Sequence, residues 1–310
     1  MIGTITLNPS IDQLITVKRL VKDDANRALS VDHYPGGKGV NVSKVVRELG
    51  GKTRAHVLLG GFTGNYWKHL VTRLNIPYRA ISVEGQETRI NSVVTDLKDK
   101  TQTRVSAPGP RVSERVFRLF VRQLAAARPR PFLWALGGSL PLGMNAGTYA
   151  RLIRSLQAAG MPCVLDTDDK ALKEGIEARP FMVKPNEYEM QRLMGKAYKS
   201  TGDYVEPAET LVKRGVRMVV VSLAEKGALF VTKKEAFHAQ GIRAPVKSKV
   251  GAGDSLIGGF VLGLERGLSL REAARVGIAA SASAVMREAP RLCQRGDIAK
   301  LKVRVIIKPL

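Results

Sequence analysis

The residues best suited to chemistry lie in one glycine-rich turn, Gly251, Ala252 and Gly253, which Asp254 follows directly. The next residues, 256–260, are mostly apolar and indicate a buried helix, so this turn should precede a helix N-terminus. Unpaired backbone N–H groups and the positive end of the helix dipole attract phosphate there. A carboxylate would repel a phosphate that is only bound, but as a general base it would take a proton from an attacking hydroxyl. The local pattern alone equally allows Asp254 to be a helix cap.

A second glycine-rich turn lies at 35–41 and opens the predicted helix 38–49. Gly36 and Gly37 allow the backbone to approach a ligand closely. Together with the charge of Lys38 and the amide of Asn41, this turn would suit sugar hydroxyls or a phosphate. The alternative is a strand-to-helix turn without a ligand.

Strand-like and helix-like patterns alternate along the chain. Continuous apolar runs indicate strands buried in a parallel sheet, and the segments between them indicate covering helices. The predicted strands are 2–7, 55–60, 131–136, 163–166 and 217–223. The predicted helices lie near 38–49, 64–74, 113–127, 144–158, 186–194 and 206–213, and 253–287 is almost wholly helical with a break at Gly267. This alternation predicts an α/β fold, a three-layer α/β/α sandwich with a mostly parallel central sheet.

Three segments, near 12–20, 28–34 and 91–106, do not fit that sheet. Alternating apolar and polar residues predict half-exposed strands, which would form a small antiparallel sheet beside the main body. Such a sheet would serve as a lid, because lids exclude water from phosphoryl transfer. No repeat, low-complexity tract or linker divides the chain, so we expect residues 1–310 to form one domain with this lid.

The composition excludes several classes of protein. No apolar stretch is long enough to span a membrane, and the first residues lack the layout of a signal peptide. The two cysteines, Cys163 and Cys293, offer neither a disulfide framework nor the spacing of a metal site. We therefore expect a protein of the reducing cytoplasm with no membrane partner.

The charge points to anionic ligands, since 50 Lys and Arg residues oppose 27 Asp and Glu residues, a net charge of +23. Nucleotides, sugar phosphates and nucleic acid would all be attracted. Nucleic acid is the less favoured partner, because aromatic residues make up only 5% and no zinc-finger or RNA-binding signature is present. The alternative from another functional class is a basic, non-catalytic sugar- or nucleic-acid-binding protein.

Further motifs accompany the two glycine turns. They are an aspartate after the first strand (Asp12), Arg-Ile-Asn at 89–91, Gly-Gly-Ser-Leu-Pro at 137–141, Asn-x-x-Glu at 186–189 and the turn 222–227. In this order, and over essentially the whole chain, the set resembles the ribokinase-like (PfkB) family of carbohydrate kinases. The resemblance is greater to its hexose-phosphate branch, which holds 1-phosphofructokinases and tagatose-6-phosphate kinases. One departure is Ala224, which stands where the family usually has glycine.

The resemblance implies a role for each motif. Asp254 would be the catalytic base, with the amides of Gly251, Ala252 and Gly253 as an anion hole. The substrate-binding residues would be Asp12, Gly36, Gly37, Lys38, Asn41, Arg89 and Ser139, with Arg89 gripping the substrate phosphate. The nucleotide-binding residues would be Lys184, Asn186, Ser222, Lys226, Gly227 and Gly253. Glu189 and Asn186 would organise Mg²⁺; for this helix start, a plain helix cap is the alternative.

The implied activity is ATP-dependent, Mg²⁺-requiring phosphorylation of a hexose phosphate. D-Fructose 1-phosphate, which would give fructose 1,6-bisphosphate, is the expected acceptor, and tagatose 6-phosphate or fructose 6-phosphate are the alternatives. The partners would thus be ATP and a sugar phosphate, together with a second copy of the chain joined through the lid.

Overall fold

The computed structural model describes residues 1–288 and 290–310. The strands are β1 (Ile2–Thr6), β2 (Ser10–Val17), β3 (Ala28–Gly36), β4 (Thr53–Leu59), β5 (Tyr78–Ser82), β6 (Arg89–Asp96), β7 (Thr101–Val105), β8 (Leu133–Gly137), β9 (Cys163–Asp166), β10 (Met182–Val183), β11 (Met218–Ser222), β12 (Gly227–Thr232), β13 (Ala236–Gln240) and β14 (Ile307–Pro309). The helices are α1 (Lys38–Glu48), α2 (Gly61–Arg73), α3 (Glu114–Ala125), α4 (Thr148–Ala158), α5 (Asp169–Ile176), α6 (Glu187–Met194), α7 (Val205–Lys213), α8 (Ala252–Glu265), α9 (Leu270–Val285) and α10 (Arg295–Lys302).

A 10-stranded sheet forms the centre, in the order β14-β13-β12-β11-β10-β9-β8-β1-β4-β5. The strands from β5 to β11 pair in parallel, whereas β12, β13 and β14 extend the sheet with antiparallel pairings. The carboxyl ends of the parallel strands therefore share one edge of the sheet, where open α/β folds bind their ligands. The prediction of a mostly parallel central sheet is confirmed.

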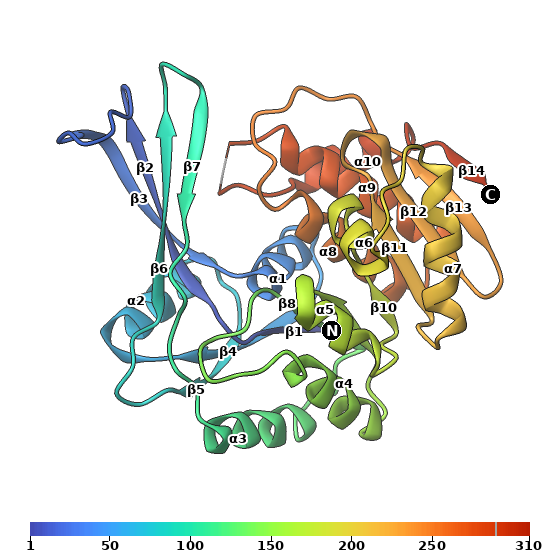
Figure 1. The fold of residues 1–310 in the computed structure, drawn as a ribbon, viewed down its shortest axis with the longest axis horizontal. Helices are drawn as coiled ribbons and strands as arrows, with labels where there is room; N and C mark the ends of the chain where they lie inside the picture. The colour runs from blue at the N-terminus through green and yellow to red at the C-terminus, as the bar shows by residue number, and fades with distance from the viewer. Residues whose placement is uncertain (289) are drawn as a thin grey trace.

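Helices cover both faces of this sheet (Figure 1). One core includes Phe120 of α3 and Leu152 of α4, and the core on the opposite face includes Val45 of α1, Phe260 of α8 and Ala274 of α9. All five side chains are fully buried. The layered α/β/α arrangement predicted from the alternating patterns is thus confirmed.

Glycines set the position of α8, the helix that begins at the chemically interesting turn. A Cβ added at Gly258 would lie 2.6 Å from Val45 of α1, and one at Gly259 would lie 2.9 Å from the Cβ of Ala280 in α9. Because neither glycine has a side chain, α8 packs closely between the two helices. This packing brings the start of α8 beside the start of α1.

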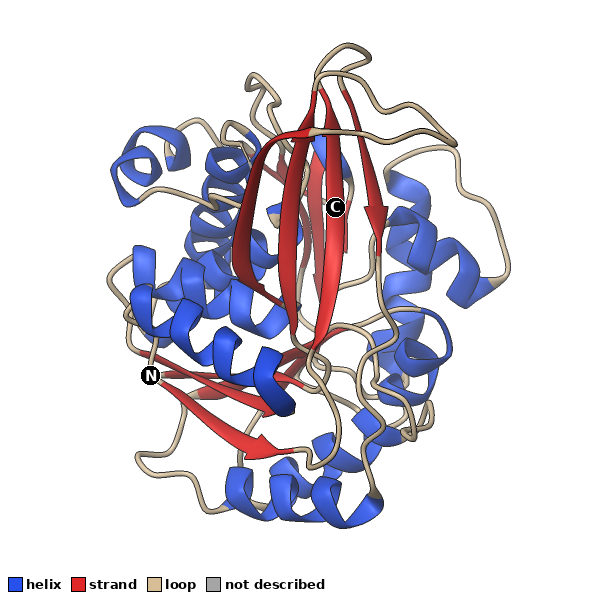
Figure 2. Cartoon of the chain, turned by 90° about the vertical axis from the view of Figure 1, so that its left-hand side faces the viewer, coloured by secondary structure: helices blue, strands red, loops and turns tan. Residues whose placement is uncertain are grey.

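The small sheet has the strand order β3-β2-β6-β7 and projects at the left of Figure 1. Figure 2 faces this sheet, with its strands upright over the main body. The three segments expected to leave the large sheet do form it, but it is not wholly antiparallel, because β2 and β6 pair in parallel. The chain runs through α1, β4, α2 and β5 between β2 and β6, and such a long connection permits parallel pairing.

Several elements were not predicted, among them β5, β13 and α10. The strands β5 and β13 are only partly buried, so they lack the continuous apolar run that marked the central strands. In the described part of the chain, no helix combines the length and the apolar character that crossing a bilayer requires.

Candidate active site

Asp254 lies in the first turn of α8, at the carboxyl edge of the large sheet. The helix starts at Ala252 with Gly251 as its N-cap. Ala252 and Gly253, which we expected just before the helix, therefore lie in its first turn together with Asp254. Gly251 has a φ of 75°, which favours glycine. The N–H of Ser255 is the first to bond within the helix, to the carbonyl of Gly251. The backbone N–H groups before it lack intrahelical partners and remain available to an anion.

The Asp254 side chain does not cap the helix. Its Oδ2 accepts a hydrogen bond of 2.8 Å from Nδ2 of Asn41 in α1, and only 8% of the residue is exposed. Burial, and then the negative charge of Asp166, raise the pKa of Asp254 to about 6, which Lys38 and the bond from Asn41 partly oppose. A carboxylate with such a pKa is ionised at neutral pH yet basic enough to accept a proton.

A second buried carboxylate, Asp166 at the end of β9, binds two lysines. Its Oδ1 lies 3.0 Å from Nζ of Lys38 and 3.4 Å from Nζ of Lys184. Burial alone would raise the pKa of Asp166, but the two ammonium groups hold it below its ordinary value. A Cβ added at Gly253 would lie 3.4 Å from Nζ of Lys184, so this ammonium group contacts the turn before Asp254. The pairing of Asp166 with these two lysines was not predicted from the sequence.

Asp12 of β2 forms the centre of a polar cluster at the base of the small sheet. Its Oδ1 accepts hydrogen bonds from Ser10 Oγ at 2.8 Å and from Asn91 Nδ2 at 2.9 Å, and Nη2 of Arg104 lies 3.7 Å away. A Cβ at Gly36 would lie 2.5 Å from the Asp12 carboxylate, which explains the glycine there. Arg104 was not predicted as a member of this cluster, and Asn91 was named only as part of the Arg-Ile-Asn motif at 89–91 without a role of its own.

Arg89 lies next to this cluster, with most of its guanidinium group turned to the backbone. Nη1 donates to the carbonyl of Ala107 and Nη2 to the carbonyl of Asn8, each at 3.0 Å. Its buried Nε has no hydrogen-bond partner among the described residues. Asn8 also donates to Ser139 Oγ at 3.3 Å, so Asn8 links the two predicted residues Arg89 and Ser139. The position of Asn8, four residues before Asp12 and directly after the first strand, was the signal that could have identified it.

A cavity of about 670 Å³ opens on the other side of the α8 turn. Of the predicted nucleotide residues, Asn186, Ser222, Gly227 and Gly253 line it. Its apolar wall was missed, because such side chains look like ordinary core residues in sequence. That wall includes Ile242, Val246, Leu256, Ile278, Ala282 and Val285. A pocket that combines an apolar wall with polar side chains suits a nucleotide base.

Asn186 and Glu189 form a capping box at the start of α6, as the alternative interpretation had it. Asn186 Oδ1 accepts from the backbone N–H of Glu189 at 2.9 Å, and Glu189 Oε2 accepts from the backbone N–H of Asn186 at 2.8 Å. Glu189 Oε1 is not used by the cap. Burial raises the pKa of Glu189. Glu189 also lines a separate cavity of about 690 Å³ together with Ser139.

One predicted nucleotide residue stays apart from the others. Lys226 is exposed and does not line the cavity that its neighbours Ala224 and Gly227 line. Ala224 has a φ of 49°, a left-handed conformation that favours glycine. The departure seen in the sequence is therefore a residue in strained backbone at the edge of the cavity.

Comparison with known proteins gives a consistent result. The profile of the pfkB family carbohydrate kinases matches residues 5–295. The 1-phosphofructokinase of Bacillus subtilis is 33% identical over 93% of both chains, and the ATP-dependent 6-phosphofructokinase isozyme 2 of Escherichia coli is 32% identical over 97% of both. The structure of Escherichia coli phosphofructokinase-2 in complex with fructose-6-phosphate superimposes with a TM-score of 0.90, at 31% identity over 98% of both chains. The chain therefore belongs to the pfkB family of carbohydrate kinases.

Proposed function

We propose that this kinase transfers the γ-phosphoryl group of ATP to a hydroxyl of D-fructose 1-phosphate, giving fructose 1,6-bisphosphate. The single observation that carries the proposal is the buried Asp254 carboxylate at the start of α8, next to Gly253, which lines the 670 Å³ cavity. Similarity to sugar-phosphate kinases, including the 1-phosphofructokinase of Bacillus subtilis, supports a hexose phosphate as the acceptor.

In the proposed reaction, Asp254 accepts the proton of the attacking hydroxyl. The hydroxyl oxygen forms a bond to the γ-phosphorus, the bond from that phosphorus to the bridging oxygen breaks, and ADP leaves with the electron pair. The amides of Gly251, Ala252 and Gly253 would donate to the charged oxygens of the transferring group. Lys38 and Lys184 bring positive charge to the same place, and Asp166 fixes their ammonium groups.

Asp12 and the residues around it would hold the acceptor. The Asp12 carboxylate would accept hydrogen bonds from sugar hydroxyls, because the bonds that it accepts from Ser10 and Asn91 already fix its orientation. Arg89, whose buried Nε lacks a partner among the described residues, would donate to the acceptor's own phosphate, with Ser139 nearby. Gly36 and Gly37 would let the backbone approach the sugar.

The chain also fits Mg²⁺, which would neutralise charge on the nucleotide phosphates. Within the residues that the structure describes, no three His, Cys, Asp or Glu side chains gather as a metal cluster. Mg²⁺ keeps several waters and needs only one or two carboxylates, so such a cluster is not required. Glu189 would hold it through Oε1, while Asn186, whose oxygen is engaged in the cap, would act by orienting Glu189.

The small sheet would act as the lid and join two copies of the chain. The register places Val31 and Val105 on the face opposite Asp12, and Leu29 follows the same alternation. Val31 is 47% exposed, Val105 is 63% exposed and Leu29 is 64% exposed.

The buried, unpaired cysteines, Cys163 and Cys293, support the cytoplasm as the place of reaction.

A panel of acceptors tests the substrate. With ATP and Mg²⁺, we expect the highest kcat/KM for fructose 1-phosphate, lower values for fructose 6-phosphate and tagatose 6-phosphate, and almost no turnover of unphosphorylated fructose. Coupled measurement of ADP release gives these values. Preference for a 6-phosphate would assign the protein to that alternative, and preference for an unphosphorylated sugar would contradict the role of Arg89.

Replacing the base tests the mechanism. Asp254→Asn keeps the shape of the side chain but removes its basicity, so kcat should fall by roughly 10²- to 10⁴-fold. The KM values for both substrates should change little. Steady-state kinetics on the folded variant measures kcat and the KM values. Asp203→Asn, which makes the same exchange at an exposed position, is the control. Turnover of Asp254→Asn near the wild-type rate would remove Asp254 from the reaction.

The pH dependence of kcat/KM should follow the Asp254 carboxylate. Because its pKa is raised to about 6, the base is protonated below that pH, and kcat/KM should fall as the pH drops through about 6. Asn41→Ala removes a hydrogen bond that lowers this pKa, so the acidic limb should move to higher pH. A limb that arises from ionisation of the sugar phosphate would not move in this variant.

The lid interface predicts the mass of the protein in solution. Sedimentation velocity should give a dimer for the wild type and a monomer for Val31→Glu, because a charge on this face has no partner in the interface. Leu119→Glu, at a 52% exposed position of α3, should leave the dimer intact. A wild-type monomer at micromolar concentration would disprove the interface.

A further inference from the structure

Lys44 is a half-buried lysine of α1 that the proposed reaction does not use. Its Nζ donates to the backbone carbonyl of Pro35 at 2.6 Å and to Asn41 Oδ1 at 3.2 Å. The other end of the Asn41 amide donates to Asp254. Three side chains, from Lys44 through Asn41 to Asp254, thus form one continuous chain of hydrogen bonds.

The chemistry of lysine decides which way the Asn41 amide faces. An ammonium group only donates hydrogen bonds, so the group it contacts on Asn41 has to be the oxygen. The amide nitrogen must then face Asp254, where it donates to the carboxylate. Without Lys44, the amide could turn its oxygen toward Asp254 and repel the ionised base. Ionised Asp254 favours the same orientation, because a carboxylate only accepts, but a protonated Asp254 could donate to the amide oxygen. Lys44 disfavours that reversed orientation and so supports the ionised form.

Lys44 also connects this chain to the small sheet. Pro35 lies near the end of β3, and the chain passes from there into the turn of Gly36 and Gly37 that opens α1. The bond from Lys44 to the Pro35 carbonyl therefore ties the base of the sheet to the residue that orients Asp254. A shift of this strand end would therefore reach Asp254 through three hydrogen bonds in series.

We propose that Lys44 is a positioning residue, which fixes the polarity of the Asn41 amide and thereby holds Asp254 ionised and correctly oriented for proton abstraction. The proposal rests on the assignment of Asp254 as the base. Catalysis would then also depend on a residue outside the proposed substrate sites, because Lys44 lines a different cavity. That cavity has a volume of about 340 Å³ and lies between α1, the end of β3 and the segment 290–293.

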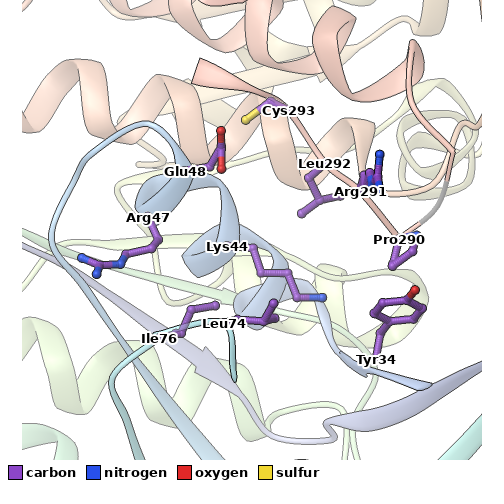
Figure 3. A pocket seen from close by; sticks show the side chains of 10 residues that line it. All are labelled: Tyr34, Lys44, Arg47, Glu48, Leu74, Ile76, Pro290, Arg291, Leu292 and Cys293. Carbon is purple, nitrogen blue, oxygen red and sulfur yellow. The ribbon is translucent and has the colours of Figure 1, made fainter. Parts of the chain in front are cut away.

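Figure 3 shows Lys44 extending into this cavity with its amine directed toward the Tyr34 side, while Arg47 points elsewhere. The cavity leaves room for a longer side chain at position 44, which makes arginine a usable replacement. Arg47 belongs to the same helix and lines the same cavity but has no hydrogen bond to Asn41, so it provides a matched control.

The surrounding charges keep Lys44 protonated at neutral pH. Burial lowers its pKa to about 8, and the carboxylates of Asp12 on β2 and Asp254 on α8 oppose this lowering. At pH 7 the group is therefore mainly an ammonium, the form that can only donate. The other titratable side chains around the cavity are Tyr34, Arg47, Glu48, Arg291 and Cys293.

The test compares Lys44→Met, Lys44→Arg and Arg47→Met in the full-length enzyme, with thermal melting to establish that each is folded. Lys44→Met should lower kcat roughly 10-fold, the size of effect typical for residues that orient a reacting group. It should also move the acidic limb of kcat/KM to higher pH while changing the KM for ATP little. Lys44→Arg, a cationic donor, should restore both values, and Arg47→Met should resemble the wild type.

A double-mutant cycle separates positioning from general support. If Lys44 acts through Asn41, Lys44→Met should have almost no further effect on kcat or on the pH limb in an Asn41→Ala background. Additive effects, or a lower melting temperature with unchanged kcat and pH limb, would overturn the proposal. Asp254→Asn distinguishes the two levels: if it is inactive but Lys44→Met is normal, only the role of Lys44 fails. If Asp254→Asn is active, the proposed function itself fails.

Discussion

The structure depends on keeping two carboxylates charged inside the protein. Burial favours the protonated form of both carboxylates, and the charge of Asp166 raises the pKa of Asp254 further. An isolated buried charge would simply take up a proton. Here Lys38 and Lys184 bind Asp166 directly, while Asp254 has only the Asn41 amide and the more distant lysines. The two acids therefore differ: Asp166 stays ionised and fixes cations, whereas Asp254 keeps a pKa near neutrality, as a base requires.

The parallel sheet brings these groups together. Asp166 ends β9, Lys184 follows β10, and both therefore reach the same edge of the sheet. Lys38 and Asn41 enter from the first turn of α1, and Asp254 enters from the first turn of α8. The glycines at 258 and 259 let α8 pack against α1 closely enough for Asn41 to reach Asp254. The site is thus a product of strand order and helix packing, and not of any single loop.

The sequence predicted the local features better than the long-range ones. Buried strands such as β1 and β11 were found because their apolar runs are continuous, whereas β5 at the sheet edge was missed because it is only partly buried. The glycine turn and Asp254 were found from neighbouring residues. The link of Asp166 to Lys38 joins residues 128 positions apart, and nothing in either neighbourhood reports it. The parallel pairing of β2 with β6 escaped for the same reason, since register across a long connection is set by tertiary packing.

The residues proposed to hold the acceptor lie between Asp12 and Ser139. They all precede Lys184, the first of the residues proposed to bind the nucleotide. The cavity proposed for the nucleotide draws its lining from residues 186–285. In the proposed assignment, the residues that select the acceptor and those that select the nucleotide thus lie in separate stretches of the chain, and only the start of α8 serves both. On that assignment, recombination between related kinases near residue 180 would exchange one preference and leave the other intact.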